Sequence, residues 1–460
     1  MIKYFLVLTL PSIIKYLYDY INGNSKGPIP LPILGNLIFL LKDYKNRINR
    51  FTQLTNEFGN ACQVYIPSLR GFTRWIFIND VPSIKHILKD NFNNYPKGDE
   101  FYTIFKDLLG NGIFNVDGCV WSSQRKISSY KFNIKSLREN MITVFVKHAD
   151  DTIQQIKNSE QSQFDMKKYL YNYTLASIFE IGFGEDLQNI SNHVEFSNSF
   201  DTVQPLFEYR FINPFWKLQK LFNIGSEAKI KYHMKLINQT LYKIINNKKF
   251  SGNDILSQFI KHDYITKIQL RDIMINFLIA GRDTTASLLN RSYYIILSNL
   301  KYKNIILDEW KEYKNFEYKT ISNLKYLKAF LYECIRLYPP VPKNSKIAIN
   351  DDILPDGKKI FANDRIIFSP YNIGHSEDHW VNSKEFRPER WLNEESNNKN
   401  SYKFLGFNAG YRTCLGKNMA ILEASIMLIK LLQNLDLKLV DNKIEDKHGL
   451  LLDIDQLIVH

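Results

Sequence analysis

The residues with the clearest capacity for chemistry lie near the C-terminal end of the chain, around Cys414. Residues 407–416 read FNAGYRTCLG, and a helical pattern follows from about Met419 to Leu435. Unpaired N–H groups and positive potential at a helix start favour a thiolate and lower the pKa of a thiol. Gly410 permits a tight turn towards the sulfur, Gly416 leaves room for a flat ligand, and Arg412 offers a fixed charge for a carboxylate. The pattern therefore predicts a ligand-binding thiolate.

A second group of chemical interest, AGRDTT at residues 280–285, interrupts a long helical pattern that runs from Lys267 to Leu300. Glycine inside a helix costs about 1 kcal/mol relative to alanine, and a threonine hydroxyl can bond back to a carbonyl and bend the helix. Asp283 and Thr284 then stand at a notch where water or dioxygen can sit. The alternative is a helix kink without a chemical role.

These groups must be positioned by a mainly α-helical fold with a small β portion. Most of the chain has helical periodicity, whereas strand patterns are few. Residues 64–66 and 75–78 look like one hairpin interrupted by residues 67–70, and residues 365–368 are a further strand candidate. A chain of 460 residues would ordinarily divide into two or more domains, yet no Pro-, Gly- or Ser-rich linker divides the body.

The loop matches every fixed position of F-x-x-G-x-R-x-C-x-G, so the chain resembles the cytochrome P-450 family, and AGRDTT resembles that family's A-G-x-D-T-T signature. The resemblance implies one large, mainly helical domain that binds haem b, with Cys414 as the axial thiolate ligand of the iron. It also implies that Arg412 pairs with a haem propionate, that Phe407 shields the sulfur, and that Gly410 and Gly416 shape the cofactor site.

Three further motifs agree with this resemblance. Trp121 and Arg125 form W-x-x-x-R, which the family places on a propionate. Glu333 and Arg336 form E-x-x-R ahead of FRPERW at residues 386–391, which implies a Glu333–Arg336–Arg390 network under the loop; a solvated surface pair is the plain alternative. One departure is Lys346, which stands where the family commonly has a propionate-binding arginine. His375 is a further candidate for a propionate or an ordinary exposed residue.

The activity implied is that of a haem-thiolate monooxygenase, with Thr284 hydrogen-bonding dioxygen and Asp283 relaying protons to it. The electrons would come from NADPH through cytochrome P-450 reductase, with cytochrome b5 as a second candidate donor. Two rival interpretations are a haem-thiolate isomerase or dehydratase that needs no reductase, and a non-catalytic haem-binding protein. A zinc site is a third, but Cys414 lacks partner ligands at metal spacing.

The sequence also suggests partners. Four lysines flank the haem-related motifs and could form a docking face for an acidic reductase, or be scattered solvated residues: Lys126, Lys131, Lys403 and Lys417. Two aromatic groups suggest a lipophilic small-molecule substrate, although core packing is an alternative for each member. They are Phe101, Tyr102, Phe105 and Phe114, and Phe207, Tyr209, Phe211, Phe215 and Trp216. We expect a monomer.

Composition narrows the remaining possibilities. The formal net charge is +13, but the lysines are dispersed and no nucleic-acid motif stands out, so we expect no nucleic-acid partner. The four cysteines do not make a disulfide framework. We expect Cys62, Cys119 and Cys334 to be small buried residues, in a reducing compartment.

The N-terminal region predicts attachment to a membrane. Residues 4–14 are apolar, and residues 1–21 approach the roughly 20 residues needed to cross a bilayer. A cleaved signal peptide and a helix lying in the interface are alternatives to this anchor. Residues 22–36 contain prolines at alternate positions and predict a stiff hinge or an arm packed on the body. We expect residues 37–460 to form the catalytic domain, on the cytosolic side of the endoplasmic reticulum.

Overall fold

The structure is a computed structural model. It describes residues 14, 17–18, 26–31, 34–41, 47–68, 71–132, 140–190, 192–248, 254–262, 264–313, 315–392, 401–441 and 443–460. The chain forms two compact units, each considered by itself. The sheet unit comprises Met1–Gly98, Arg336–Phe386 and Asn398–Cys414, and the helical unit comprises Asp99–Ile335, Arg387–Asn397 and Leu415–His460.

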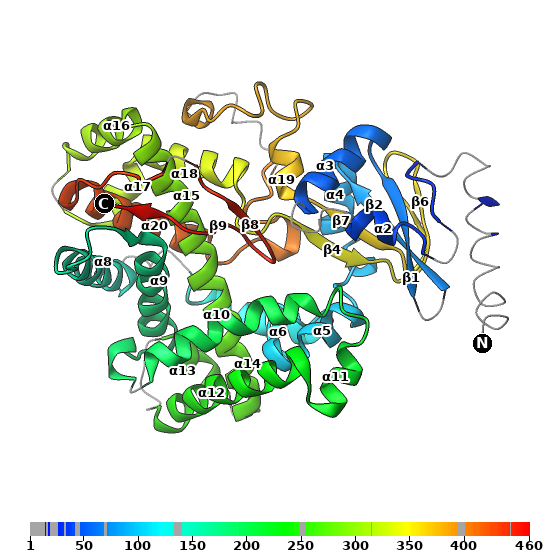
Figure 1. The fold of residues 1–460 in the computed structure, drawn as a ribbon, viewed down its shortest axis with the longest axis horizontal. Helices are drawn as coiled ribbons and strands as arrows, with labels where there is room; N and C mark the ends of the chain where they lie inside the picture. The colour runs from blue at the N-terminus through cyan, green and yellow to red at the C-terminus, as the bar shows by residue number, and fades with distance from the viewer. Residues whose placement is uncertain are drawn as a thin grey trace. The chain divides into compact units, whose positions relative to one another are not determined.

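The sheet unit is built on four strands in the order β1-β2-β7-β4 (Figure 1). Strands β1 (Cys62–Ser68) and β2 (Gly71–Ile78) are antiparallel, β2 is parallel to β7 (Arg365–Phe368), and β7 is antiparallel to β4 (Asn344–Ile347). The smaller pieces are α2 (Leu37–Leu41), η2 (His86–Asp90), η3 (Phe92–Asn94), β5 (Asp352–Ile353), β6 (Lys359–Ile360) and α19 (Pro370–Gly374).

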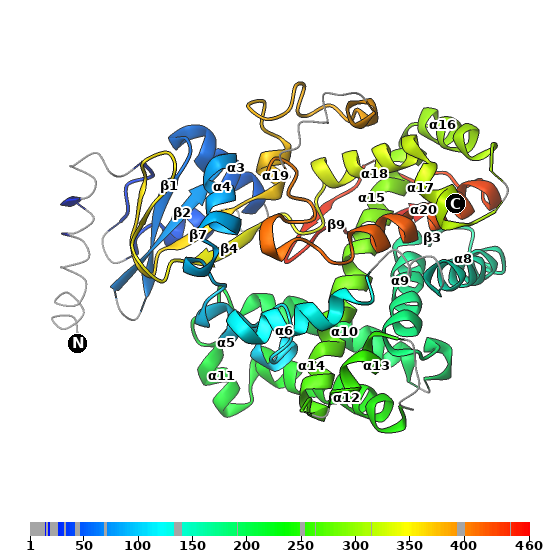
Figure 2. The same cartoon turned by 180° about the vertical axis from the view of Figure 1, so that it is seen from behind.

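Both faces of this sheet are buried. Successive side chains of a strand point to opposite faces, so neighbouring residues belong to different cores. Phe77 packs beneath helix α3 (Arg47–Phe58), with its ring 4.9 Å from that of Phe51. Ile76 and Ile78 belong to the core on the other face, which also includes residues of α4 (Val81–Lys85). Figures 1 and 2 show these two helices beside the sheet.

The predicted hairpin exists, but its predicted break was wrong. Pro67 lies inside β1 opposite Phe72, and the strand continues to Ser68. Proline is tolerated there because β1 is an edge strand, which pairs with another strand of this sheet on one side only. The separate prediction of a strand at residues 365–368 is confirmed by β7.

The proline-rich segment packs against β1 where the structure describes it. Lys26 O accepts a 2.8 Å bond from Gln63 N, and Asn36 Nδ2 donates to Pro28 O at 3.0 Å. The interpretation as a packed arm is therefore correct for residues 26–31. The predicted anchor, residues 1–21, falls almost entirely outside the described residues. Among the helices that are described, none has the length and apolar character needed to cross a bilayer.

The helical unit confirms the mainly α-helical prediction. Its central helix α15 (Thr284–Ser298) contacts α9 (Met166–Phe183) and α20 (Lys417–Asn434), as Figures 1 and 2 show. Its other elements are α5 (Asp99–Leu109), α6 (Gly118–Ser129), α8 (Ile142–Lys157), β3 (Phe164–Asp165), η5 (Leu187–Asn189), α10 (His193–Tyr209), α11 (Trp216–Phe222), α12 (Gly225–Asn247), α13 (Ile255–Ile260), α14 (Lys267–Leu278), η6 (Ile279–Asp283), α16 (Lys301–Trp310), α17 (Tyr318–Asn323), α18 (Lys325–Leu337, whose end lies in the sheet unit), η7 (Pro388–Trp391), β8 (Asp446–His448), β9 (Leu452–Ile454) and β10 (Ile458–Val459).

The long predicted helix begins and breaks where the sequence indicates. Thr266 and Gln269 form a reciprocal capping box, so α14 begins at Lys267. The helix widens into the π-helical turn η6 and then continues as α15 to Ser298. Because π-turns inside α-helices often mark functional sites, the break itself supports a chemical role for AGRDTT.

Candidate functional site

The cysteine loop folds as a tight turn that ends with Cys414 exposed. Cys414 N donates to Phe407 O at 2.8 Å, and Thr413 Oγ1 donates to Gly410 O at 2.7 Å. Gly410 has a φ of +65°, and a Cβ there would lie 2.1 Å from Leu88 O, a backbone atom that cannot move aside. Only glycine fits this position, so the loop geometry depends on it.

The exposed thiol of Cys414 distinguishes it from two of the other cysteines. Cys62 and Cys334 are buried, and burial raises the pKa of Cys62 to about 12 and also raises that of Cys334. Neither can supply a thiolate at neutral pH. Cys119 is exposed, so its prediction as a buried residue was wrong: it is the second residue of α6 and faces outward.

Two cations approach a single ring close to the loop. Arg412 Cζ lies 5.9 Å and Lys346 Nζ 5.8 Å from the centroid of Phe92, and Lys346 is only 3% exposed in β4. Both side chains carry a positive charge, which suits a ligand that carries carboxylates. These residues, with the exposed sulfur of Cys414, suit an iron porphyrin, which carries carboxylates and accepts a thiolate ligand.

Other predicted cofactor residues belong to the helical unit. Arg125 Cζ lies 5.8 Å from the ring centroid of Trp121 on α6, which confirms that the two side chains share a helix face. Gly416 is the N-cap of α20. The unit therefore holds Trp121, Arg125, Gly416, Asp283 and Thr284, and the sheet unit holds Cys414, Arg412, Phe407, Gly410 and Lys346.

His375 has a local role. Its Nδ1 lies 2.8 Å from Tyr371 O, and its ring stacks on that of Tyr371 at 4.0 Å.

The acid–hydroxyl pair lies in and just after the π-turn. Thr284 Oγ1 donates to Ala280 O at 2.6 Å, which is the predicted back-bond. Gly281 packs against α9, where an added Cβ would lie 2.7 Å from the Ile178 side chain. Ala280, Gly281 and Thr284 remain partly exposed, whereas Asp283 is buried. The π-turn therefore leaves part of the helix accessible at Ala280, Gly281 and Thr284, while the carboxyl group of Asp283 is enclosed.

Asp283 has an altered acidity and an unforeseen partner. Burial raises its pKa to about 6, although Arg282 opposes the shift. Arg282 Nη1 lies 3.0 Å from Asp283 Oδ1 and 2.5 Å from Asp201 Oδ1 on α10. Sequence reasoning missed Asp201 because 81 residues separate it from Arg282. The only sequence signal was a charged residue in the variable position of AGRDTT.

The predicted E-x-x-R residues are structural and buried, which rules out a solvated surface pair. Glu333 is fully buried, and its Oε1 accepts bonds of 2.9 Å from both Arg390 Nε and Arg387 N. Its Oε2 accepts a 2.9 Å bond from Trp391 Nε1. The predicted Glu333–Arg390 contact is therefore confirmed.

Within the sheet unit, the guanidinium of Arg336 donates to three carbonyl oxygens, those of Gly374, Ser383 and Glu385. Such buried charges need several bonds each to offset their desolvation.

The aromatic groups predicted to line the substrate region meet within the helical unit. Phe105 on α5 lies 6.3 Å from Phe207 on α10 and 5.7 Å from Phe211, with ring centroids compared. Phe101 lies 4.9 Å from Phe105. Phe105 and Phe207 are fully enclosed, so they are core residues, while Phe211 is 40% exposed.

One predicted docking lysine was misplaced. Lys131 is buried and desolvation lowers its pKa, so it cannot contribute to an exposed face. Lys126 is exposed, and Lys403 and Lys417 are partly exposed.

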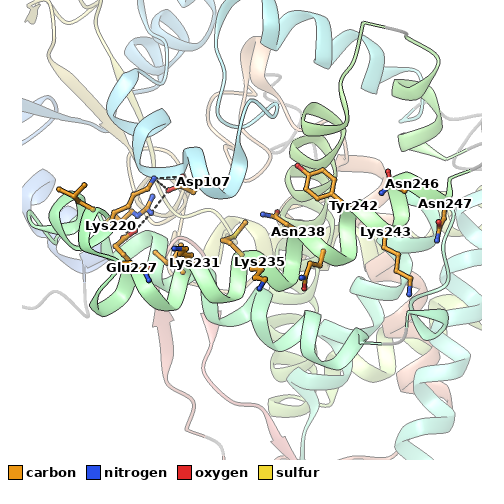
Figure 3. A pocket seen from close by; sticks show the side chains of 16 residues that line it. Asp107, Lys220, Glu227, Lys231, Lys235, Asn238, Tyr242, Lys243, Asn246 and Asn247 are labelled. Atoms are coloured by element: carbon orange, nitrogen blue, oxygen red, sulfur yellow. Dashed lines mark hydrogen bonds and ion pairs between the residues drawn. The ribbon is translucent and has the colours of Figure 1, made fainter.

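A pocket of about 1070 Å³ runs along α12 (Figure 3). Lys231, Lys235 and Lys243 line it, and dashed lines in Figure 3 mark the 2.7 and 2.8 Å contacts between Lys220 and Asp107. None of the predicted site residues lines this pocket. It is a basic groove on the helical unit and not a candidate active site.

A comparison with protein-family models decides the family. The model described as Cytochrome P-450 matches residues 25–459, which is nearly the whole chain. The chain belongs to the cytochrome P-450 family. Members bind haem b through an axial cysteine thiolate and act as monooxygenases, so this is a haem-thiolate monooxygenase.

Plant relatives match over most of their length. The chain is 32% identical to cytochrome P-450 704B1 of Arabidopsis thaliana, covering 93% of this chain and 92% of the relative. It is 31% identical to cytochrome P-450 94A1 of Vicia sativa, covering 86% and 82%. It is 33% identical to cytochrome P-450 94A2 of Vicia sativa, covering 87% and 84%.

The alternative of a zinc centre finds no support in the described part of the chain. No group of three or more His, Cys, Asp or Glu side chains there could hold a metal ion. A haem needs only one protein ligand on its thiolate side, which is consistent with Cys414 acting alone.

Proposed function

We propose that this cytochrome P-450 holds its haem through Cys414 and inserts one oxygen atom into a lipophilic substrate. The geometry of the loop is the main support: glycine at 410 fixes a turn that leaves the Cys414 thiol exposed. Arg412 and Lys346 would neutralise propionates, with Trp121, Arg125, Phe407 and Gly416 completing the cofactor site. A thiolate-ligated haem, when bound, supplies activation of dioxygen.

The test is the optical spectrum of the reduced, carbon-monoxide-bound protein. Cys414→Ser should abolish the thiolate-type band, because serine cannot supply the soft anionic ligand. Cys119→Ser is the matched control, since Cys119 is also exposed but lies outside the loop. An unchanged thiolate band in Cys414→Ser would refute the assignment.

In the chemical step, Asp283 and Thr284 would supply and position protons. The oxygen chemistry that a bound haem would supply consumes protons, so the protein must deliver them in a controlled way. Asp283 can hold a proton near neutral pH because burial raises its pKa to about 6. The Thr284 hydroxyl, anchored by donation to Ala280 O, presents its lone pairs away from that carbonyl. We assign proton supply to Asp283 and proton placement to Thr284.

The electron donor is proposed to be NADPH-cytochrome P-450 reductase, with cytochrome b5 as an additional donor and the enzyme acting as a monomer. Support comes from the net charge of +13 and the accessible Lys126, Lys403 and Lys417, which would attract an acidic protein.

Salt dependence tests charge-guided docking, and dependence on reduced cofactor separates this proposal from the rival activities. Reductase-driven turnover should fall steeply between about 0.05 and 0.5 M salt, because screening weakens exposed charge contacts, whereas peroxide-driven turnover should not. Equal salt sensitivity of the two reactions would rule out charge-guided docking. Product formation without any reduced cofactor would instead indicate an isomerase or dehydratase.

A further inference from the structure

Three charged residues in the helical unit form a chain from solvent to the buried acid. The Asp201 side chain on α10 is 51% exposed, whereas those of Arg282 and Asp283 are 1% and 2% exposed. Arg282 Nη1 is shared by the two carboxylates, at 2.5 Å from Asp201 Oδ1 and 3.0 Å from Asp283 Oδ1. The guanidinium of Arg282 therefore pairs with one exposed and one buried carboxylate.

The surroundings hold Arg282 in this shared position. Its Cζ lies 4.8 Å from the ring centroid of Tyr171 and 5.6 Å from that of Phe200, and Nη2 donates to Ser197 Oγ at 3.4 Å. Arg282 Nε and Asp283 Oδ2 are buried and make no close hydrogen bond to any described residue, although the Gln204 side chain is near enough to Asp283 to lower its pKa. Arg282 itself bonds only one of the two carboxyl oxygens of Asp283.

An arginine cannot pass a proton along this chain, because its guanidinium does not deprotonate in proteins. Arg282 can instead share its positive charge between the carboxylates of Asp201 and Asp283. If it paired with Asp283 alone, that carboxyl would stay ionised and could not donate. The exposed carboxylate of Asp201 draws on the same guanidinium and weakens that hold.

We propose that Asp201 is a positioning residue for proton delivery: by sharing Arg282 it leaves Asp283 free to take up a proton from water and to release it towards Thr284. The proposal rests on the proposed function only for the destination of the proton. The divided ion pair itself is independent of turnover. Each cycle is balanced, since the proton lost by Asp283 is replaced from water.

The other charged groups near Asp283 keep their own partners. On α9, Tyr171 donates to Asp453 Oδ2 at 2.7 Å, and Lys167 Nζ contacts the same oxygen at 2.9 Å. On α10, Gln204 lowers the pKa of Asp283, whereas the negative charge of Asp201 raises it. Removing the charge of Asp201 should therefore lower the pKa of Asp283 and shift its protonation to more acidic pH.

The experiment is an infrared titration of the protonated Asp283 carboxyl in the full-length haem-loaded chain. The band is assigned by its loss in Asp283→Asn, which separates it from the buried Glu423, whose pKa burial also raises. In Asp201→Asn the midpoint should fall by about one pH unit, a tenfold loss of the protonated form at a given higher pH. Asp201→Glu keeps the negative charge and should therefore keep the wild-type midpoint.

The matched control is Glu195→Gln, which removes one exposed carboxylate from the first turn of the same helix. It should leave the midpoint unchanged. Should Asp201→Asn fold poorly, Asp201→Ser makes the same charge change at this half-exposed position. Midpoints that agree in wild type, Asp201→Asn and Glu195→Gln would overturn the proposal.

Coupling measurements separate this inference from the proposed function. The pH above which product per reduced cofactor declines should fall with the infrared midpoint in Asp201→Asn. A shifted midpoint with unchanged coupling would uphold the divided ion pair but refute Asp283 as the proton source, and with it the delivery role of Asp201. An unshifted midpoint with defective coupling in Asp283→Asn would refute only the role of Asp201.

Discussion

At the scale of single residues, burial decides which of several chemically identical side chains is reactive. Cys414 and Cys62 are both thiols, yet only Cys414 is exposed and able to bind a ligand as a thiolate. Asp283 and Asp201 are both carboxylates, yet burial raises the pKa of Asp283 to about 6, whereas Asp201 is open to water. The same side chain therefore serves as a structural group or a reactive one according to its surroundings.

Replacing Thr284 tests the proton-placement role. Thr284→Ala removes the hydroxyl and its bond to Ala280 O, and substrate affinity should persist. Product formation should fall roughly 10²-fold, the scale of a lost proton transfer, with reduced cofactor diverted to peroxide. Product, NADPH and peroxide are measured together. Thr284→Ser keeps the hydroxyl and should retain coupling; a well-coupled alanine variant would contradict the role.

At the scale of elements, the helix ends and breaks follow local sequence signals. The capping box Thr266–Gln269 starts α14, and glycine with threonine marks the π-turn before α15. Strand ends were less predictable: Pro67 looks like a strand breaker, but β1 lies at the edge of the sheet, where proline is tolerated. Sheet order is a tertiary property that no single strand encodes.

The buried contacts at the end of α18 provide an element-scale prediction. Glu333→Gln removes the negative charge that pairs with the buried Arg390, which should lower the free energy of unfolding by about 3–5 kcal/mol. Chemical denaturation of the haem-loaded protein measures this change. Glu312→Gln, at an exposed position following α16, should change stability by less than about 0.5 kcal/mol. Equal effects of the two variants would show that the Glu333 cluster does not hold the element in place.

At the scale of the whole molecule, we propose association with a membrane of the endoplasmic reticulum. The N-terminal apolar segment is one support. The other is an exposed apolar patch on and around α11, which soluble surfaces rarely carry. It comprises Phe215, Leu218, Leu221, Phe222 and Ile224.

Fluorescence quenching tests this patch in the full-length chain. Phe222→Trp should be quenched by brominated lipids in vesicles, because the side chain is 67% exposed and would enter the bilayer interface. Leu300→Trp, at an apolar position that is 56% exposed outside the patch, should not be quenched. The signal of each variant is compared with that of the wild-type tryptophans. Equal quenching at both positions would argue against membrane contact by α11.

The sequence by itself determined the family, the mainly helical fold, the cysteine loop and the break at AGRDTT, because these are written in short contiguous patterns. Only the tertiary structure decided that Lys131 is buried, that Cys119 is exposed, that Phe105 meets Phe207, and that Asp201 reaches Arg282. Burial and long-range pairing depend on which helices pack together, and local periodicity carries no record of that choice.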